Sequence, residues 1–153
     1  MSHATLPVRI PRNAYVFVGD GRKALFLRND GDAMFPKLQT ERVMTHDNPP
    51  TREQGTDRPG SSHASVGSRR SSMEQTDWHE IEEQRFAKEV ADALAVLVRE
   101  KHVSALIIAA PPRTLAELRR AFHPDVTRLI IAEIDKDFTH QPVHDIERRL
   151  TAA

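Results

Sequence analysis

The chain has 153 residues, and its 22 Lys and Arg are balanced by 22 Asp and Glu, so the net charge at pH 7 is zero. This length suits one domain with a real core, and the balance excludes a general attraction to nucleic acid or anionic membranes. The chain has no cysteine, which excludes disulfides and thiolate chemistry. No apolar run reaches the length of a signal peptide or a membrane span, so we expect a soluble cytoplasmic protein with no membrane partner.

The first third of the chain has the pattern of an antiparallel meander after a flexible leader at residues 1–12. Residues 14–18 are β-branched and aromatic, which predicts a strand, and residues 23–28 form the return strand. Asp20 and Gly21 between them predict a type I′ turn, which needs positive φ at both central positions. A third strand is predicted at residues 38–44, with one face formed by Leu38, Thr40, Arg42 and Met44.

The second half changes to a helical period. Residues 77–101 form a predicted helix that begins with the capping pair Asp77 and Glu80 and is roughly 35 Å long. Its apolar positions are Trp78, Ile81, Phe86, Val90, Ala93, Leu94 and Leu97. Residues 103–110 and 126–134 are predicted parallel strands in a βαβ unit. The helix between them covers residues 115–122 and has a predicted capping box formed by Thr114 and Glu117. A last helix begins near Pro142, and Val143, Ile146 and Leu150 share one of its faces. The sum is an α/β protein with a mixed sheet and helices packed on it.

A polar segment, residues 46–76, separates the two halves, and we call it the arm. Val66 and Met73 are its only sizeable aliphatic side chains. A loop this long inside a compact domain is usually functional or disordered, and both interpretations stay open. Arginines suit phosphate contacts, and the arm carries four of them: Arg52, Arg58, Arg69 and Arg70. Nearby acidic residues offset their charge, so any attraction to RNA depends on geometry and on salt.

A second predicted site lies at the carboxyl edge of the parallel strands, where α/β proteins usually bind ligands. Arg113 and Thr114 follow one strand and Lys136 follows the next, so together they could hold an anion. A helix cap plus a surface ion pair is the alternative. Two groups of potential metal ligands have simpler explanations. The first is the set of strand-end carboxylates Asp20, Glu133, Asp135 and Asp137, of which Asp20 is explained by its turn and the others lie within five residues of one another. The second is the pair His140 and His144, which is explained by a helix start at Pro142. We therefore predict no metal, no cofactor and no assigned catalytic residue.

Five stretches of the chain occur in one order that matches a known family. They are VFVGDGRKALF at 16–26, DRPG at 57–60, FA at 86–87, AAPPRTL at 109–115 with LR at 118–119, and DKDFT at 135–139. The chain resembles a bacterial family named for proteins required for attachment to host cells. That family is related to the central domain of archaeal and eukaryotic peptide-chain release factors. The similarity covers roughly residues 14–150.

The resemblance implies an RNase H-like mixed five-stranded sheet in a single domain at residues 13–153. It also implies that the arm and the helix after it match the release-factor loop that enters the ribosomal peptidyl-transferase centre. There a Gly-Gly-Gln tripeptide assists hydrolysis of peptidyl-tRNA. This chain has no Gly-Gly-Gln, and the nearest counterpart is DRPGS at residues 57–61.

Three hypotheses of function follow. The leading one is a non-enzymatic ribosome- or tRNA-associated module whose arm contacts RNA or another partner through Arg52, Asp57, Arg58, Pro59, Gly60, His63, Arg69 and Arg70. The second is a host-attachment factor that acts indirectly from the cytoplasm. The third is a hydrolase of RNA or of an aminoacyl or peptidyl ester that uses Asp57, Arg58 and His63. The oligomeric state stays open, although an exposed edge strand could pair two subunits in a homodimer.

Overall fold

The computed structural model describes residues 6–46 and 71–152, and only the backbone of residues 71–76. Its five-stranded sheet has the order β3-β2-β1-β4-β5. The strands are β1 (Tyr15–Gly19), β2 (Lys23–Asn29), β3 (Leu38–Thr45), β4 (Leu106–Ala109) and β5 (Ile130–Ile134). β1, β2 and β3 pair antiparallel, whereas β1 with β4 and β4 with β5 pair parallel. The predicted mixed α/β sheet of five strands, RNase H-like in kind, is confirmed.

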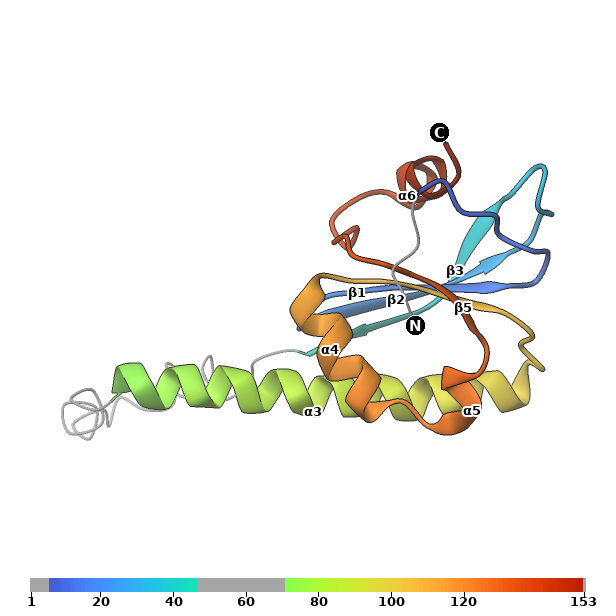
Figure 1. The fold of residues 1–153 in the computed structure, drawn as a ribbon. Coiled ribbons are helices and arrows are strands. Elements are labelled where there is room, and N and C mark those ends of the chain that lie inside the picture. Colours follow the sequence, from blue (N-terminus) through green and yellow to red (C-terminus); the bar gives the residue numbers. More distant parts are fainter. Residues whose placement is uncertain (1–5, 47–70, 153) are drawn as a thin grey trace.

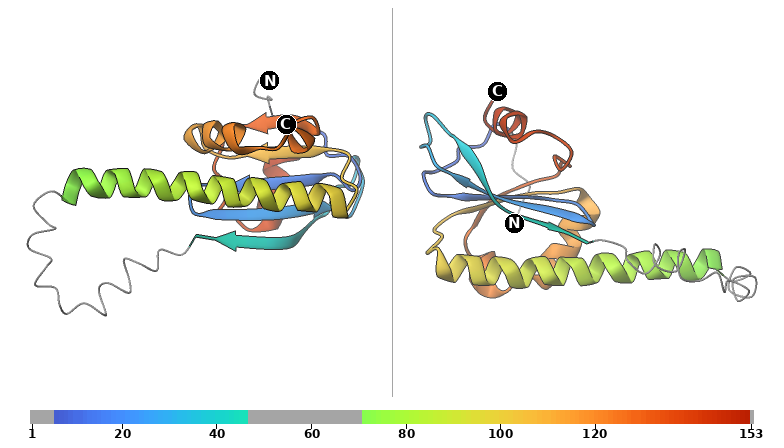
Figure 2. Two further views of the ribbon diagram at one scale, coloured as in Figure 1. Left: turned by 90° about the horizontal axis from the view of Figure 1, so that it is seen from below. Right: turned by 180° about the vertical axis from the view of Figure 1, so that it is seen from behind.

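Helices cover both faces of this sheet (Figure 1). The long helix α3 (Ser71–Glu100) lies on one face together with α4 (Pro112–Ala121) and the short α5 (Pro124–Thr127). The opposite face carries α6 (Val143–Thr151). Two further views show the same three layers from below and from behind (Figure 2). The sheet is therefore enclosed on both sides, which explains why its central strands are apolar throughout.

The side chains of the central strands alternate between two cores. Tyr15 and Phe17 of β1 point to the core under α3, whereas Val16 and Val18 point to the core under α6. Residues 6–12, which belong to the predicted leader, also contribute: Ile10 is fully buried in the second core, and the Val8 N–H donates to the Leu150 carbonyl at 2.7 Å. From residue 6 on, this segment is packed rather than loose.

The first turn differs from the predicted type I′ turn, because none of the described glycines has a positive φ. Instead, Asp20 Oδ1 accepts hydrogen bonds from the N–H groups of Arg22 and Lys23, both at 2.7 Å. A carboxylate that caps its own turn stabilises the chain reversal without left-handed backbone. Gly21 has another role, since a Cβ there would lie 3.0 Å from the Glu83 side chain.

The prediction for the faces of β3 is wrong because the strand contains a bulge. Phe26 pairs with Arg42 and the next residue, Leu27, pairs with Thr40, so Glu41 is an extra residue on β3. A bulge inverts the alternation of side chains beyond it. As a result Leu38 belongs to the core under α6, whereas Met44 packs against the core under α3.

Helix α3 begins at Ser71, six residues before its predicted start, so residues 71–76 of the arm are helical and Asp77 with Glu80 is no capping pair. Extending a helix that is already packed costs much less than starting one, so this end needs no core contacts of its own.

Two boundaries near the parallel strands also differ from prediction. Helix α4 begins at Pro112 with Pro111 as its N-cap and no side-chain cap, so Thr114 and Glu117 form no capping box. The predicted strand at 126–134 begins as helix α5, and only Ile130–Ile134 is strand. Pro112 and Pro124 each stand in a first helical turn, where a fixed φ favours the helix.

Candidate functional site

The predicted partner-binding residues of the arm lie outside the described residues. They are Arg52, Asp57, Arg58, Pro59, Gly60, His63, Arg69 and Arg70. What the structure does describe is the place where the arm leaves and re-enters the domain. β3 leads into the arm at His46, and residues 71–76 at the other end of the arm form the first part of helix α3 (Figure 2).

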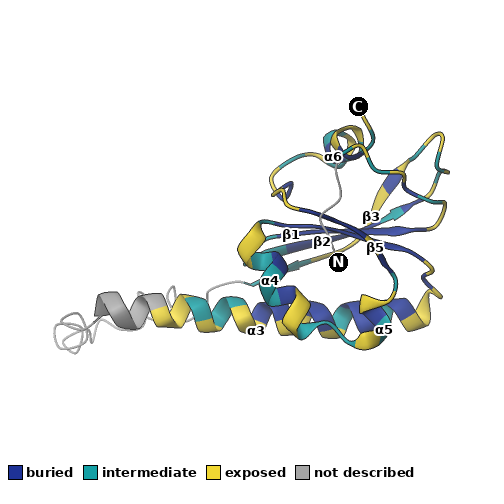
Figure 3. Cartoon of the chain, in the orientation of Figure 1, coloured by how far each residue is buried: buried dark blue, intermediate teal, exposed yellow. Residues whose placement is uncertain are grey.

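Helix α3 extends well beyond the sheet on the side of the arm (Figure 3). Its 30 residues span about 45 Å, and the first side chain that is buried in its described part is Phe86. Trp78 and Ile81, which belong to the predicted apolar stripe, are 37% and 44% exposed. The part of the helix that carries them lies beyond the edge of the sheet, so they have no core to pack against. The residues of α3 that meet the rest of the domain begin at His79 and Glu80, so about 12 Å of helix, from Ser71 to His79, projects from the domain.

The described side chains of this projecting helix are mainly acidic. Asp77, Glu80, Glu82 and Glu83 outnumber the single fixed cation Arg85 between positions 77 and 85. Such a surface repels phosphate. Any contact with a nucleic-acid backbone at this end would have to come from the arginines of the arm.

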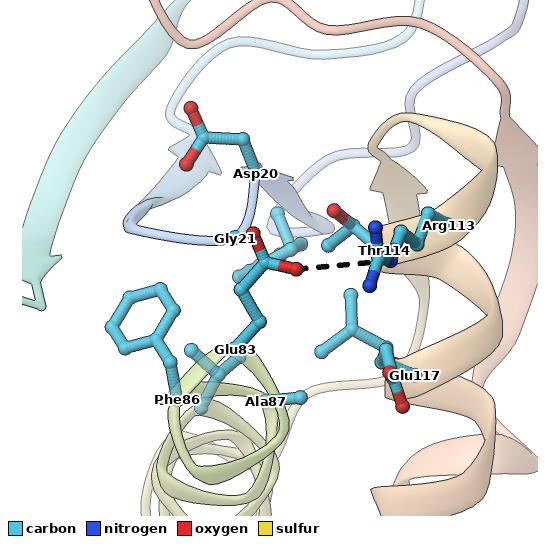
Figure 4. Close-up of a pocket in the computed structure, with 11 residues that line it drawn as sticks. Asp20, Gly21, Glu83, Phe86, Ala87, Arg113, Thr114 and Glu117 are labelled. Carbon is cyan, nitrogen blue, oxygen red and sulfur yellow. Dashed lines mark ion pairs between the residues drawn. The ribbon is translucent and has the colours of Figure 1, made fainter. Parts of the chain in front are cut away.

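A small cavity lies where the β1–β2 turn, α3 and α4 meet (Figure 4). The residues labelled there are Asp20, Gly21, Glu83, Phe86, Ala87, Arg113, Thr114 and Glu117. Its volume of about 10 Å³ is close to that of one water molecule. Binding pockets for small molecules are typically about 300 Å³ or larger. This cavity is therefore too small for a substrate.

The predicted anion site is only partly assembled. Arg113 and Thr114 stand together in the first turn of α4, whereas Lys136 lies exposed in the loop after β5. Arg113 is flanked by two carboxylates of α3, with Nε 3.8 Å from Glu83 Oε1 and Nη2 3.9 Å from Glu80 Oε1. An anion would have to compete with both, so the alternative of a surface ion pair describes Arg113 better. Anion binding stays an untested prediction.

The structure brings together three residues that the two candidate metal groups contain separately. Oxygen or nitrogen atoms of Asp20, Asp137 and His140 lie within 4.8 Å of one another. The buried Thr139 hydroxyl stands between the two carboxylates, 2.5 Å from Asp137 Oδ1 and 3.1 Å from Asp20 Oδ2. The single hydroxyl hydrogen can be donated to one carboxylate at a time, and the Thr139 N–H donates to Asp137 Oδ1 at 2.9 Å. With the turn bonds of Asp20, these contacts account for the positions of both carboxylates. The cluster fastens the β1–β2 turn to the loop after β5.

Glu133, a further acidic candidate at a strand end, has a structural partner. Glu133 is buried on β5, and its Oε1 accepts hydrogen bonds from Arg119 Nε at 3.0 Å and from Arg119 Nη2. These bonds raise the pKa of Arg119. The pair joins α4 to the sheet. Sequence reasoning missed it, because no local signal links residues on different elements.

One comparison decides the family of this domain. The family model of bacterial archaeo-eukaryotic release factor family 12 matches residues 13–150. The chain belongs to this family. The release-factor part of the resemblance is thus confirmed over almost the whole chain, which supports a ribosome-related module at that coarse level, whereas a role in host attachment stays untested. No curated protein matches the sequence significantly. No helix in the described ranges combines the length and the apolar composition needed to cross a membrane.

Proposed function

We propose that the protein is a non-enzymatic, cytoplasmic ribosome- or tRNA-associated module that inserts its arm into an RNA cleft. In this proposal Arg58, Arg69 and Arg70 contact phosphates. The other arm residues that we expect to face the partner are Arg52, Asp57, Pro59, Gly60 and His63.

The observation that carries the proposal is the projecting part of α3. A helix that extends about 12 Å past the residues that contact the rest of the domain can carry a segment away from it. Membership of the release-factor family supports a ribosomal setting for such a segment. The absence of Gly-Gly-Gln from the sequence favours binding over hydrolysis.

Co-sedimentation of the purified protein with ribosomes at a series of salt concentrations tests the proposal. We expect binding that weakens with salt, and a triple variant with alanine at positions 58, 69 and 70 that loses most of it. The loss of three phosphate contacts should make the negative slope of log affinity against log salt shallower by about 2 to 3. The matched control carries alanine at three exposed arginines outside the arm: Arg12, Arg148 and Arg149. This control should bind like the unmodified protein.

Two results contradict the proposal. The first is no sedimentation with ribosomes or tRNA at moderate salt. The second is equal loss in the arm variant and the control variant, because that would show a general charge effect. Turnover of peptidyl-tRNA that His63→Ala abolishes would favour the hydrolase hypothesis instead.

A further inference from the structure

We propose that His46 is a positioning residue that fixes the amino end of the arm to helix α3. The inference rests on the proposed function, because a fixed base matters only if the arm binds a partner. His46 is the first residue of the arm and the last one described on its amino side, and its contacts reach two other elements. We call these contacts the His46 clamp: Glu82 and Phe86 on α3, and Arg22 in the β1–β2 turn.

The His46 clamp holds both the backbone and the ring of the residue. The His46 N–H donates to the Arg22 carbonyl at 2.7 Å, which extends the pairing beyond the last residue of β3. Nε2 lies 2.5 Å from Glu82 Oε1, and the ring stands 5.8 Å from the Phe86 ring at an angle of 46°. The side chains of His46 and Glu82 are both largely buried, at 19% and 12% exposed.

The carboxylate of the clamp is itself held in place. Arg85 Nη1 donates to Glu82 Oε2 at 3.2 Å, so Oε1 remains directed to His46. A hydrogen bond to a charged group in a half-buried place is stronger than one at the surface. Removing the imidazole would leave a largely buried carboxylate with one partner fewer.

The clamp lies where α3 leaves the domain. Glu82 is one helical turn before Phe86, the first buried residue in the described part of the helix, and Ser71 lies 11 residues before Glu82. The arm is therefore attached to α3 through His46 at Glu82, and it enters the helix at Ser71, about 16 Å away along the helix axis. A segment held at both ends by a rigid support has fewer conformations to lose on binding, which favours affinity.

The structure offers a second histidine as a comparison. His123 also pairs with a carboxylate of α3, with Nε2 2.8 Å from Asp92 Oδ1, but this pair is more exposed and lies between α4 and α5 rather than at the arm. His46→Ala and His123→Ala each remove one imidazole paired with a carboxylate of α3. His46→Gln keeps a donor that can reach Glu82 and serves as the rescue variant.

The test measures backbone hydrogen exchange in the free protein and ribosome co-sedimentation at a temperature where every variant is folded. In His46→Ala we expect about tenfold faster exchange at the end of β3 and a Kd raised five- to tenfold, with both values near those of the unmodified protein in His46→Gln and His123→Ala. A tenfold change corresponds to about 1.4 kcal/mol. Trp78, the single tryptophan, stands one turn before Glu82 and gives a second readout by fluorescence quenching.

The two proposals fail in different ways. Unchanged exchange in His46→Ala overturns the clamp, whatever the ribosome does. Faster exchange with unchanged binding overturns the positioning role alone. If the unmodified protein does not bind ribosomes or tRNA, the proposed function is refuted, and the role of His46 in binding is refuted with it.

Discussion

Replacing Tyr15 with Phe removes a hydroxyl that links the first and third strands of the meander. The Tyr15 hydroxyl donates to Glu41 Oε1 at 2.6 Å, and Arg28 of the intervening strand donates from Nε to Glu41 Oε2 at 2.8 Å. Hydrogen bonds to charged groups contribute about 1.5–3 kcal/mol, but the Glu41 side chain is 26% exposed and water compensates part of the loss. We expect Tyr15→Phe to lower the free energy of unfolding at pH 7 by about 1–2 kcal/mol.

The effect should depend on pH. The Tyr15 hydrogen bond, and after it the Arg28 contacts, hold the pKa of Glu41 below its ordinary 4.5, although burial opposes them. A carboxyl group with a depressed native pKa stabilises the fold above its unfolded pKa, and this stability is lost as the pH falls through the native pKa. Because Tyr15→Phe removes the largest cause, the difference between the two proteins should shrink below pH 4.5.

Urea unfolding followed by circular dichroism at pH 7 and at acid pH measures this difference. Glu41→Gln in both backgrounds completes a double-mutant cycle, in which the coupling between the two positions should fall at acid pH. A destabilisation that is the same at both pH values would refute the reasoning.

The basic limb gives an independent check. Burial and then the Glu41 hydrogen bond raise the pKa of Tyr15 well above its ordinary 10. The stability from the protonated phenol is complete below pH 10 and is lost as the pH rises toward the native pKa. Because the chain has one tyrosine, the ultraviolet absorbance of tyrosinate reports this group alone. A native midpoint near pH 10 would contradict the assigned contact.

Two further substitutions test contacts that hold the loops. Asn29→Ala removes a fully buried side chain whose amide forms hydrogen bonds with the Ile10 carbonyl before β1 and with the Gly31 and Lys37 N–H groups of the β2–β3 loop. We expect the free energy of unfolding in urea to fall by about 3 kcal/mol. A fall of less than about 1 kcal/mol would show that these loops do not depend on Asn29. Thr139→Val removes the hydroxyl between Asp20 and Asp137 and should cost about 1–2 kcal/mol in the same assay, whereas Thr139→Ser, which keeps the hydroxyl, should cost clearly less.

Local patterns were reliable wherever a whole element shared one period. The first two strands of the meander and the last helix are close to where the sequence predicts them, because each buries one face or both faces of a regular element. Predictions of single residues at boundaries were less reliable. Asp20 turns the chain with its carboxylate, Glu41 is a bulge, and Pro112 starts α4 two residues before Thr114, and each of these depends on competing local interactions.

The sequence alone determined the α/β class and the order of the strands along the chain, since these depend on composition and period. The tertiary structure decided which distant residues meet. Asp20 and Thr139 are 119 positions apart and His46 and Glu82 are 36 apart, and only the strand order and the packing of α3 bring them into contact. The structure also showed that Trp78 and Ile81 face solvent, because a helical period records a possible core face but not where the sheet beneath it ends.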